Sequence, residues 1–290
     1  MRPPKFLNWQ KPLFLILLGS LFLLCRPPGT EAQTGKGLDL WIHPYLPATE
    51  LVNHFAPLAA YLEKELGQPV RVKIQSSYQS HIDFVGQNHA DLAFMGPAGY
   101  VAMRRQYSPK PLLAKLEEKG SPFFRGMIIV PRDFAGNSLT DLKGKSFAFG
   151  DPNSTMSYIV PRAMLQEAGV TLADLKRHDH LKSHHDVALA VLGGYFDAGA
   201  VKDEVFEAYS KRGLRALATS PPVPDHIFVT RSDLPPQLVA RLRTLLLAIK
   251  QHPQGQEIMG AIKGNITGLV PVEAKDYDQL EKMMRSVIGD

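Results

Sequence analysis

Blocks of apolar residues alternate along the chain with amphipathic segments, and this pattern predicts strands followed by helices. Residues 38–44 (LDLWIHP) are typical of a strand, and apolar side chains then recur at helical spacing from Phe55 to Leu66, with Gly67 as the stop. Residues 70–74 (VRVKI) alternate with a period of two, which predicts a strand that is half exposed or lies at a sheet edge. Strands that alternate with helices favour a parallel sheet covered on both faces.

The same alternation continues through the rest of the chain. It predicts a helix around residues 81–88, apolar strands over 91–96 (DLAFMG) and 127–134 (MIIVPRDF), a short buried strand over 196–201 (FDAGAV) and a helix over 235–250. In open α/β sheets, ligands bind beyond the carboxyl ends of the strands. We therefore expect binding residues just after several of these strands.

The pattern falls into two sets of strands and helices, which separate near residue 130 and rejoin through the proline-rich segment 220–229 (SPPVPDHIFV). We therefore predict two α/β lobes that are linked by more than one crossing and enclose a ligand cleft. One lobe is expected to hold residues 37–129 and 228–290, and the other residues 130–227.

Residues 146–165 (SFAFGDPNSTMSYIVPRAML) place an apolar strand, a turn and several hydroxyls in front of a helical pattern. In one interpretation Ser154 is an ordinary N-cap, which accepts a hydrogen bond from the first helical turn. In the other, free backbone N–H groups, the helix dipole and the hydroxyls of Ser154, Thr155 and Ser157 converge on a bound anion. Pro161 lies inside the helical pattern, where we expect it to bend the axis.

A second helix start carries similar chemistry. Ser183 and Asp186 have the spacing of a capping box, which places His184 in the first helical turn, where it could meet an anion. A solvated histidine and a metal ligand are the alternatives for His184. Neither an HExxH motif nor regular metal-ligand spacing accompanies the nearby histidines, so we expect no metal site.

Charged and aromatic residues follow other predicted strands. Lys202 could complete a positive pocket, and Asp203 or Glu204 could accept a hydrogen bond from a ligand amine or hydroxyl; the alternative is a solvated helix start. Three aromatic residues could form the opposite wall or serve in packing alone: His43, Tyr45 and Tyr100.

The N-terminus has the features of a secretory signal. Three basic residues precede an apolar run over residues 13–25, and residues 30–32 (TEA) resemble a cleavage site. We expect residues 1–32 to be a signal peptide that is removed, which leaves a soluble periplasmic protein. A lipid-modified Cys25 and an uncleaved anchor are the alternatives, which rank lower because the residues before Cys25 lack a small side chain.

Composition excludes several classes of protein. Removal of residues 1–32 takes away four basic residues and one acidic residue, which lowers the formal net charge from +5 to +2. This near balance gives no support for nucleic acid as a partner. No cysteine follows Cys25, so burial alone must stabilise the mature chain. No GxSxG elbow, P-loop or paired catalytic carboxylate motif appears, so we expect neither an enzyme nor a cofactor.

Six segments, in order along the chain, resemble the substrate-binding proteins of phosphate, phosphite and phosphonate ABC transporters. The segments are WIHPY (41–45), FAPLAAYLEKELGQPV (55–70), DLAFMGPAGYV (91–101), DLKGKSFAFGDPNST (141–155), HHDVALAVLGGYFDAGAVKDEV (184–205) and YDQLEKMMRSV (277–287). This resemblance implies the family's fold, the type II periplasmic binding protein, in which two hinge-linked α/β lobes close around a ligand.

The resemblance also implies roles for particular residues. In characterised phosphonate binders, the hydroxyls of an Asp-Pro-x-Ser-Thr turn and a histidine further along the chain hold the oxyanion. These roles fall on Ser154, Thr155 and His184. An acidic residue that meets an aminoalkyl group in some members corresponds to Glu204 or Asp203.

The chain departs from the family pattern in two places. Met156-Ser157 stands where many members have Ser-Gly, and Met95 stands where some have an aromatic residue. The resemblance therefore implies an exported, monomeric protein that captures a small phosphorus oxyanion (phosphate, phosphite or phosphonate) for an ABC permease, without specifying which oxyanion. A sensing module for a membrane receptor and a His-dependent metal or phosphate-ester hydrolase are the alternative functions.

Overall fold

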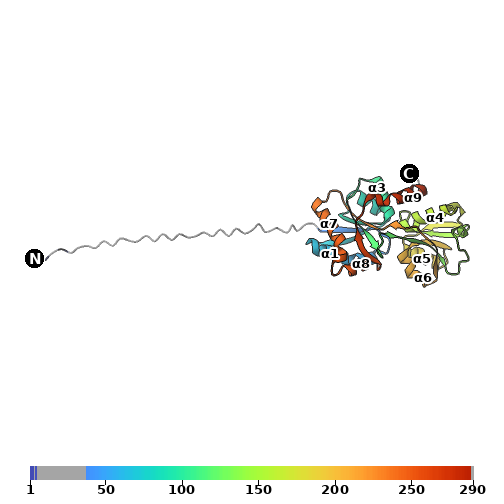
Figure 1. The fold of residues 1–290 in the computed structure, drawn as a ribbon, viewed down its shortest axis with the longest axis horizontal. Coiled ribbons are helices and arrows are strands. Elements are labelled where there is room, and N and C mark those ends of the chain that lie inside the picture. Colours follow the sequence, from blue (N-terminus) through green and yellow to red (C-terminus); the bar gives the residue numbers. More distant parts are fainter. Residues whose placement is uncertain (3, 5–36, 289–290) are drawn as a thin grey trace. The chain divides into compact units, whose positions relative to one another are not determined.

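The computed structural model describes residues 1, 2, 4 and 37–288 of the chain (Figure 1). Apart from residues 1, 2 and 4, the predicted signal peptide (1–32) lies outside the described residues, as does Cys25. All helices and strands of the described part belong to a structural unit that begins at residue 36.

The elements follow one another in the alternating order that the sequence predicts. The strands are β1 (Leu38–Ile42), β2 (Val70–Ile74), β3 (Leu92–Met95), β4 (Leu112–Glu118), β5 (Phe123–Phe124), β6 (Gly126–Pro131), β7 (Ser146–Phe149), β8 (Arg177–His180), β9 (Ala198–Lys202), β10 (Leu214–Thr219), β11 (Val223–Pro224), β12 (Ile227–Thr230) and β13 (Ile266–Val270). The α-helices are α1 (Ala48–Leu66), α2 (Tyr78–Gly86), α3 (Pro97–Gln106), α4 (Val160–Glu167), α5 (His184–Leu192), α6 (Asp203–Ser210), α7 (Pro236–Ala248), α8 (Gly255–Ile262) and α9 (Asp278–Ile288).

Two larger sheets form within the described residues. The first has the strand order β13-β4-β12-β3-β1-β2, and the second has the order β10-β6-β9-β7-β8. Both sheets are mixed, which corrects the expected parallel sheet: β1, β2 and β3 run parallel, but β12 and β4 run antiparallel to their neighbours, as do β6 and β10. Strands β6 and β12 each follow a segment by which the chain passes between the sheets, and each runs opposite to the parallel strands of its own sheet.

The chain passes between the sheets in two connections. One leads from β4 to β6 and contains β5, and the other leads from β10 to β12 and contains β11. The two short strands β5 and β11 pair antiparallel, so the connections lie side by side. The first sheet draws its strands from residues 38–118 and 227–270 and the second from residues 126–219, while the exact limits of the lobes stay a prediction.

Several boundaries follow local signals in the sequence. Helix α1 ends as predicted, because Gly67 adopts a left-handed conformation with φ of 68°. Helix α2 begins before the expected residue 81, because Ser77 and Ser80 form a capping box in front of it. Strand β2 lies at a sheet edge, as its alternation predicts.

Pro161 lies in the first turn of α4, and not in the interior of a longer α-helix as predicted. A single π-turn spans Thr155–Ile159, and α4 then begins at Val160, so that Pro161 lies in the first turn of α4. A proline there removes no intrahelical hydrogen bond, because the first N–H groups of a helix have no partner within it. The π-turn therefore interrupts the α-helical hydrogen-bond pattern just before the proline.

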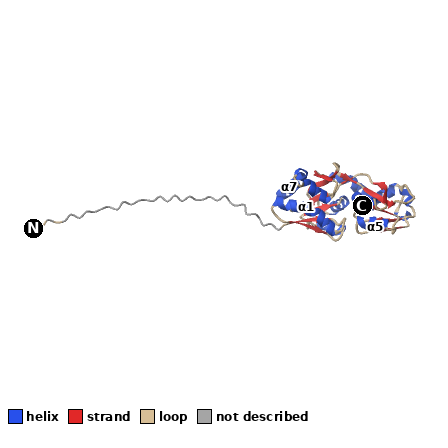
Figure 2. Ribbon diagram, turned by 90° about the horizontal axis from the view of Figure 1, so that it is seen from below, coloured by secondary structure: helices blue, strands red, loops and turns tan. Residues whose placement is uncertain are grey.

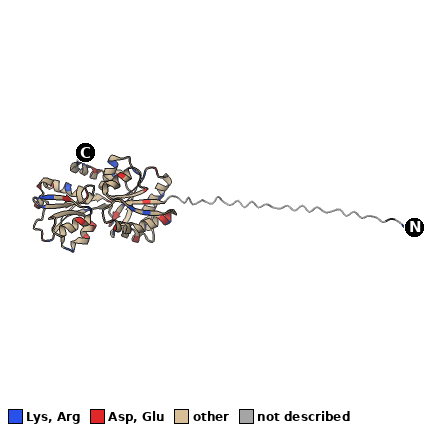
Figure 3. Ribbon diagram, turned by 180° about the vertical axis from the view of Figure 1, so that it is seen from behind, with Lys and Arg blue, Asp and Glu red and all other residues tan. Residues whose placement is uncertain are grey.

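Helices cover both faces of the sheets (Figures 1 and 2). In the first sheet, α1, α7 and α8 contribute to one apolar cluster, while α2 and α3 contribute to another. Helix α9 contacts both α3 and α4 and so packs against elements next to each sheet. Basic and acidic residues are spread over both parts of the fold (Figure 3). Among the described residues, no helix combines the length and apolar character needed to cross a bilayer.

Helix α2 carries a buried polar side chain, His81. It is 1% exposed, and neither ring nitrogen has a hydrogen-bond partner among the described residues. Burial lowers the pKa of His81 to about 3, and the nearby Phe94 carbonyl opposes this only in part. The imidazole is therefore neutral near physiological pH, and its burial without partners costs stability.

We expect His81→Leu to raise the free energy of unfolding, and to raise it more at pH 5.5 than at pH 7.5. The folded protein keeps His81 neutral down to about pH 3, whereas the unfolded chain binds a proton below about pH 6.5. The wild-type protein therefore loses stability as the pH falls below 6.5. By linkage, the advantage of His81→Leu grows by about 1.4 kcal/mol between the two pH values.

Urea unfolding of the ligand-free protein at both pH values measures this difference. His89→Leu is the matched control, because His89 is exposed in the loop after the same helix. The control should unfold with the pH dependence of the wild type. If His81→Leu raises the free energy of unfolding equally at both pH values, His81 is not a buried, neutral imidazole in the folded protein.

Candidate functional site

A small cavity lies between elements of the two sheets, and about 10 Å³ of it is open to the centre of a water molecule. Each residue that lines the cavity is buried, and none has more than 9% of its surface exposed. The lining residues are His43, Tyr45, Tyr78, Gly96, Phe124, Ser154, Thr155, Met156, His184, Lys202 and His226. One chain thus supplies the whole wall, which consists of buried residues from both parts of the fold.

Strand ends and helix starts bring these residues together. Residues just after β1, β3 and β7 line the cavity, and so does Lys202, the last residue of β9. Tyr78 is the first residue of α2, Gly96 caps α3, Thr155 opens the π-turn and His184 is the first residue of α5. The N-terminal ends of these elements, with their free N–H groups and partial positive charge, therefore converge on one space.

Ser154 serves as a cap and also lines the cavity, so the two interpretations of this residue are compatible. Its Oγ accepts a hydrogen bond from the Ser157 backbone N–H at 3.3 Å and lies 3.2 Å from His184 Nε2. The Lys202 backbone N–H donates to His184 Nδ1 at 3.0 Å, which leaves the proton of a neutral ring on Nε2. Ser154 Oγ thus accepts two hydrogen bonds, and its own proton is left for an acceptor in the cavity.

Thr155 links the two sheets. Its Oγ1 accepts a hydrogen bond at 2.9 Å from the backbone N–H of Ala98, in the first turn of α3. A hydroxyl that accepts one hydrogen bond still has a proton to donate. Thr155 can therefore donate to an anion in the cavity while it holds the start of α3.

Lys202 brings a cation to the cavity wall. Its side chain is 5% exposed, and its Nζ lies 2.5 Å from Glu204 Oε2 and 3.9 Å from the centre of the Tyr45 ring. Burial lowers the pKa of Lys202, and Glu204 opposes this effect. Burial alone would raise the pKa of Glu204, but Lys202 more than reverses the effect, so the Glu204 pKa is lowered.

The histidines of the wall are neutral in this environment. Burial is the main reason that the pKa values of His43, His184 and His226 lie below the ordinary value of 6.5. Lys202 lowers all three further by charge repulsion. A neutral imidazole has one N–H donor, and an anion nearby would favour the doubly protonated ring.

The cavity wall includes six of the predicted site residues, namely Ser154, Thr155, His184, Lys202, His43 and Tyr45. Their contact with a ligand stays a prediction. Among the described residues, no group of His, Cys, Asp and Glu side chains is arranged to hold a metal ion.

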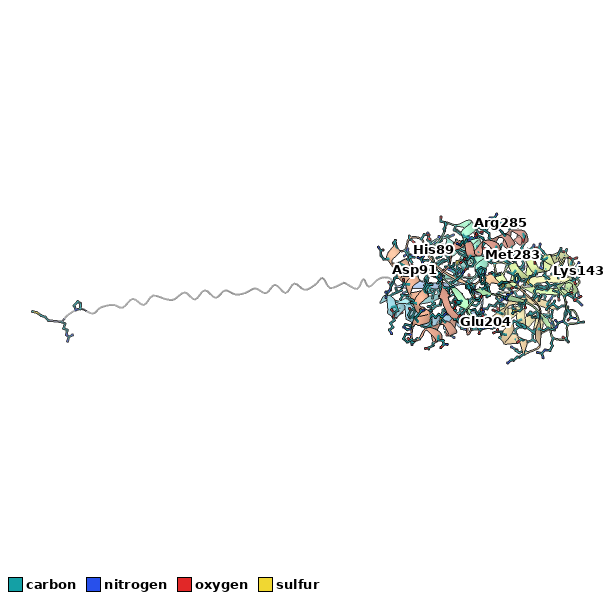
Figure 4. All side chains as sticks on the ribbon, in the orientation of Figure 1. His89, Asp91, Lys143, Glu204, Met283 and Arg285 are labelled. Carbon is teal, nitrogen blue, oxygen red and sulfur yellow. The ribbon has the colours of Figure 1, made fainter. Side chains whose placement is uncertain are left out.

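Three other predicted residues do not line this cavity, and their contact with a ligand also stays a prediction. Ser157 Oγ donates to the Ala200 carbonyl at 2.5 Å, because the π-turn directs it into the second sheet. Tyr100 packs edge-on against Tyr277, with 5.0 Å between ring centres, in the core between α3 and α9. Glu204 lies behind Lys202, where the two parts of the fold meet (Figure 4).

The predicted site residues did not include five members of the wall, namely Tyr78, Gly96, Phe124, Met156 and His226. Tyr78 could have been predicted from the sequence, since it follows a serine with capping-box spacing at a helix start. Phe124, Met156 and His226 had no local signal. Phe124 and His226 belong to the connections between the sheets, and only tertiary structure brings these connections to the cavity.

Comparisons with known proteins relate the whole fold to one family. The family model described as the periplasmic substrate-binding protein of phosphonate ABC transporters matches residues 40–277. The phosphate-import protein PhnD of Mycolicibacterium smegmatis is 28% identical over 280 residues, with 87% of each chain covered. The probable ABC transporter phosphite-binding protein PhnD1 of Prochlorococcus marinus is 24% identical over 259 residues, which cover 82% of this chain and 85% of that protein.

Solved structures agree with the sequence comparisons. The structure of PhnD1 from Prochlorococcus marinus in complex with methylphosphonate has a TM-score of 0.81 at 23% identity, and covers 88% of this chain and 99% of its own. A sulphonate-binding protein of Escherichia coli shares the fold more distantly, with a TM-score of 0.59. The chain therefore belongs to the periplasmic substrate-binding proteins of phosphonate ABC transporters, which have the two-lobed type II fold and are binding proteins, not enzymes.

Proposed function

We propose that this protein captures a small phosphorus oxyanion in the buried cavity and delivers it to an ABC permease. The observation that carries the proposal is the convergence of several helix starts, the hydroxyls of Ser154 and Thr155 and the Nε2–H of His184 on one enclosed space. These groups are hydrogen-bond donors, and Lys202 adds a positive charge. Such a wall complements an anion with several acceptor oxygens.

The size of the cavity favours a small ligand. Only about 10 Å³ of the cavity is open to the centre of a water molecule, so these walls as they stand leave no room for a bulky ligand. Phosphate, phosphite and methylphosphonate are compact tetrahedral anions. The names of the relatives refer to phosphate and phosphite, and the related structure contains methylphosphonate, which supports phosphorus over sulfur as the central atom.

A ligand reaches this cavity only when the lobes separate, because the wall is buried. The two connections between the sheets are the natural hinge. The hydrogen bond from Ala98 N–H to Thr155 joins the lobes across the cavity in the closed form. Thr155 therefore couples oxyanion binding to closure in this proposal.

The proposal includes export and a monomeric protein. Family membership and the predicted signal peptide over residues 1–32 support a periplasmic location. The cavity is complete within one chain, which supports function as a monomer. We place a membrane permease, rather than a receptor, as the partner because the family serves ABC transporters.

We expect phosphate, phosphite or methylphosphonate to raise the melting temperature of the mature protein, prepared free of bound anions by unfolding, dialysis and refolding. A ligand at 100 times its dissociation constant stabilises a protein by about 2.7 kcal/mol. For a chain of this size, this corresponds to roughly 5–11 °C. A thermal-shift screen that also contains sulfate and selenate measures the selectivity. Stabilisation by sulfate alone, or by none of these oxyanions, would contradict the proposed function.

We expect Thr155→Ala and His184→Ala each to weaken oxyanion binding by about tenfold or more, because hydrogen bonds to a charged group contribute roughly 1.5–3 kcal/mol. Thr155→Ser keeps the hydroxyl and should retain most of the affinity. Isothermal titration calorimetry with the ligand found in the screen measures each dissociation constant.

Ser157→Ala is the matched control for this series. Its hydroxyl belongs to the same π-turn but donates to the Ala200 carbonyl, away from the cavity. This variant should melt at a lower temperature and bind the oxyanion with wild-type affinity. Unchanged affinity in Thr155→Ala, or an equal loss in Ser157→Ala, would show that the cavity is not the binding site.

A further inference from the structure

A second small cavity adjoins the first, and about 10 Å³ of it is open to the centre of a water molecule. Four residues line both cavities, namely Tyr45, Phe124, Lys202 and His226. The second cavity also has walls from Glu204, Asp225 and Lys263 and from apolar side chains of the first sheet and α8. The two spaces are thus neighbours, and shared side chains separate them.

The second cavity is lined by two carboxylates and two ammonium groups. Asp225 is 2% exposed, and its Oδ1 accepts hydrogen bonds from the backbone N–H and Nδ1 of His226 at 2.6 and 2.8 Å. Its Oδ2 is buried and has no hydrogen-bond partner among the described residues. A buried carboxylate oxygen without a partner favours a donor or a cation beside it.

The protein places its own ammonium at this cavity. Lys202 begins at the end of β9, and its Nζ contacts Glu204 Oε2 at 2.5 Å and lies over the Tyr45 ring. The other lysine of the cavity, Lys263, is held by Glu118 and Asp203 at 2.7 Å each. Lys202 is therefore the cation that stands between the oxyanion cavity and the carboxylate of Glu204.

We propose that Lys202 acts as a selectivity residue: its ammonium occupies the place that the ammonium of an aminoalkyl-substituted oxyanion would take, and it thereby restricts the site to oxyanions without a cationic substituent. This inference rests on the proposed function. A ligand ammonium directed toward Glu204 meets the like charge of Lys202, and it must displace an ion pair that is already formed and buried. Asp203 and Glu204, considered from the sequence as partners of a ligand amine, are both engaged by lysines of the protein.

The same arrangement makes the second cavity a latent subsite. When the Lys202 side chain is shortened to a methyl group, Glu204 loses its adjacent cation and the barrier between the cavities is reduced. A phosphonate with a two-carbon ammonium arm then replaces the missing charge with its own. Lys202→Ala should therefore gain affinity for a ligand class that the wild-type protein rejects.

The test compares three phosphonates by calorimetry on the mature protein: methylphosphonate, 2-aminoethylphosphonate and propylphosphonate. Propylphosphonate has the shape of 2-aminoethylphosphonate, but its substituent ends in a methyl group in place of the ammonium. The wild type should bind methylphosphonate at least about tenfold more tightly than 2-aminoethylphosphonate. Lys202→Ala should bind 2-aminoethylphosphonate at least about tenfold more tightly than the wild type does, and should prefer it to propylphosphonate. The double variant Lys202→Ala/Glu204→Gln should lose that preference.

Two results would overturn the inference. In the first, the wild type binds 2-aminoethylphosphonate as tightly as methylphosphonate. In the second, Lys202→Ala folds but does not prefer 2-aminoethylphosphonate to propylphosphonate. The wild-type comparison decides the matter if Lys202→Ala does not fold, as checked by circular dichroism. If the wild type binds no phosphorus oxyanion at all, the proposed function fails, and this inference fails with it.

Discussion

The first backbone N–H groups of a helix find no acceptor within that helix, and in the described part of this protein α2, α3, the π-turn and α5 all begin around one enclosed space. Each follows a strand, so the direction of β2, β3, β7 and β8 determines where these N–H groups point. Burial strengthens their effect, because a partial positive charge interacts more strongly with an anion when water is excluded. The two sheets therefore act mainly as a frame that keeps donors aimed at one point.

Local sequence signals predicted the elements well and their long-range relations less well. Gly67 ended α1 and Ser183 capped α5 as expected, because each signal acts within a few residues. The mixed strand directions were missed, because they depend on how the chain crosses between sheets. Strand β8 (RHDH) was missed as well, because a polar edge strand lacks the apolar alternation that predicts a strand.

In the candidate site, too, local signals predicted some features and missed others, and both kinds occur within a single turn. Ser154, Thr155 and Ser157 look equivalent in the sequence, but only the first two line the cavity. The π-turn rotates Ser157 toward the backbone of Gly150 and Ala200, and no sequence signal distinguishes a π-turn from the first turn of an α-helix here. His226 could not be found either, since its place beside His43, with 5.2 Å between ring centres, depends on strand pairing between distant segments.

The antiparallel pair of β5 with β11 has a mechanical consequence. Two independent connections between two bodies permit twisting as well as bending, whereas two connections that are hydrogen-bonded to each other share one axis. Rotation about that axis changes the gap between the sheets and hardly changes their twist. The pairing thus favours opening over twisting, and in the proposed function the opening angle is what distinguishes a loaded molecule from an empty one.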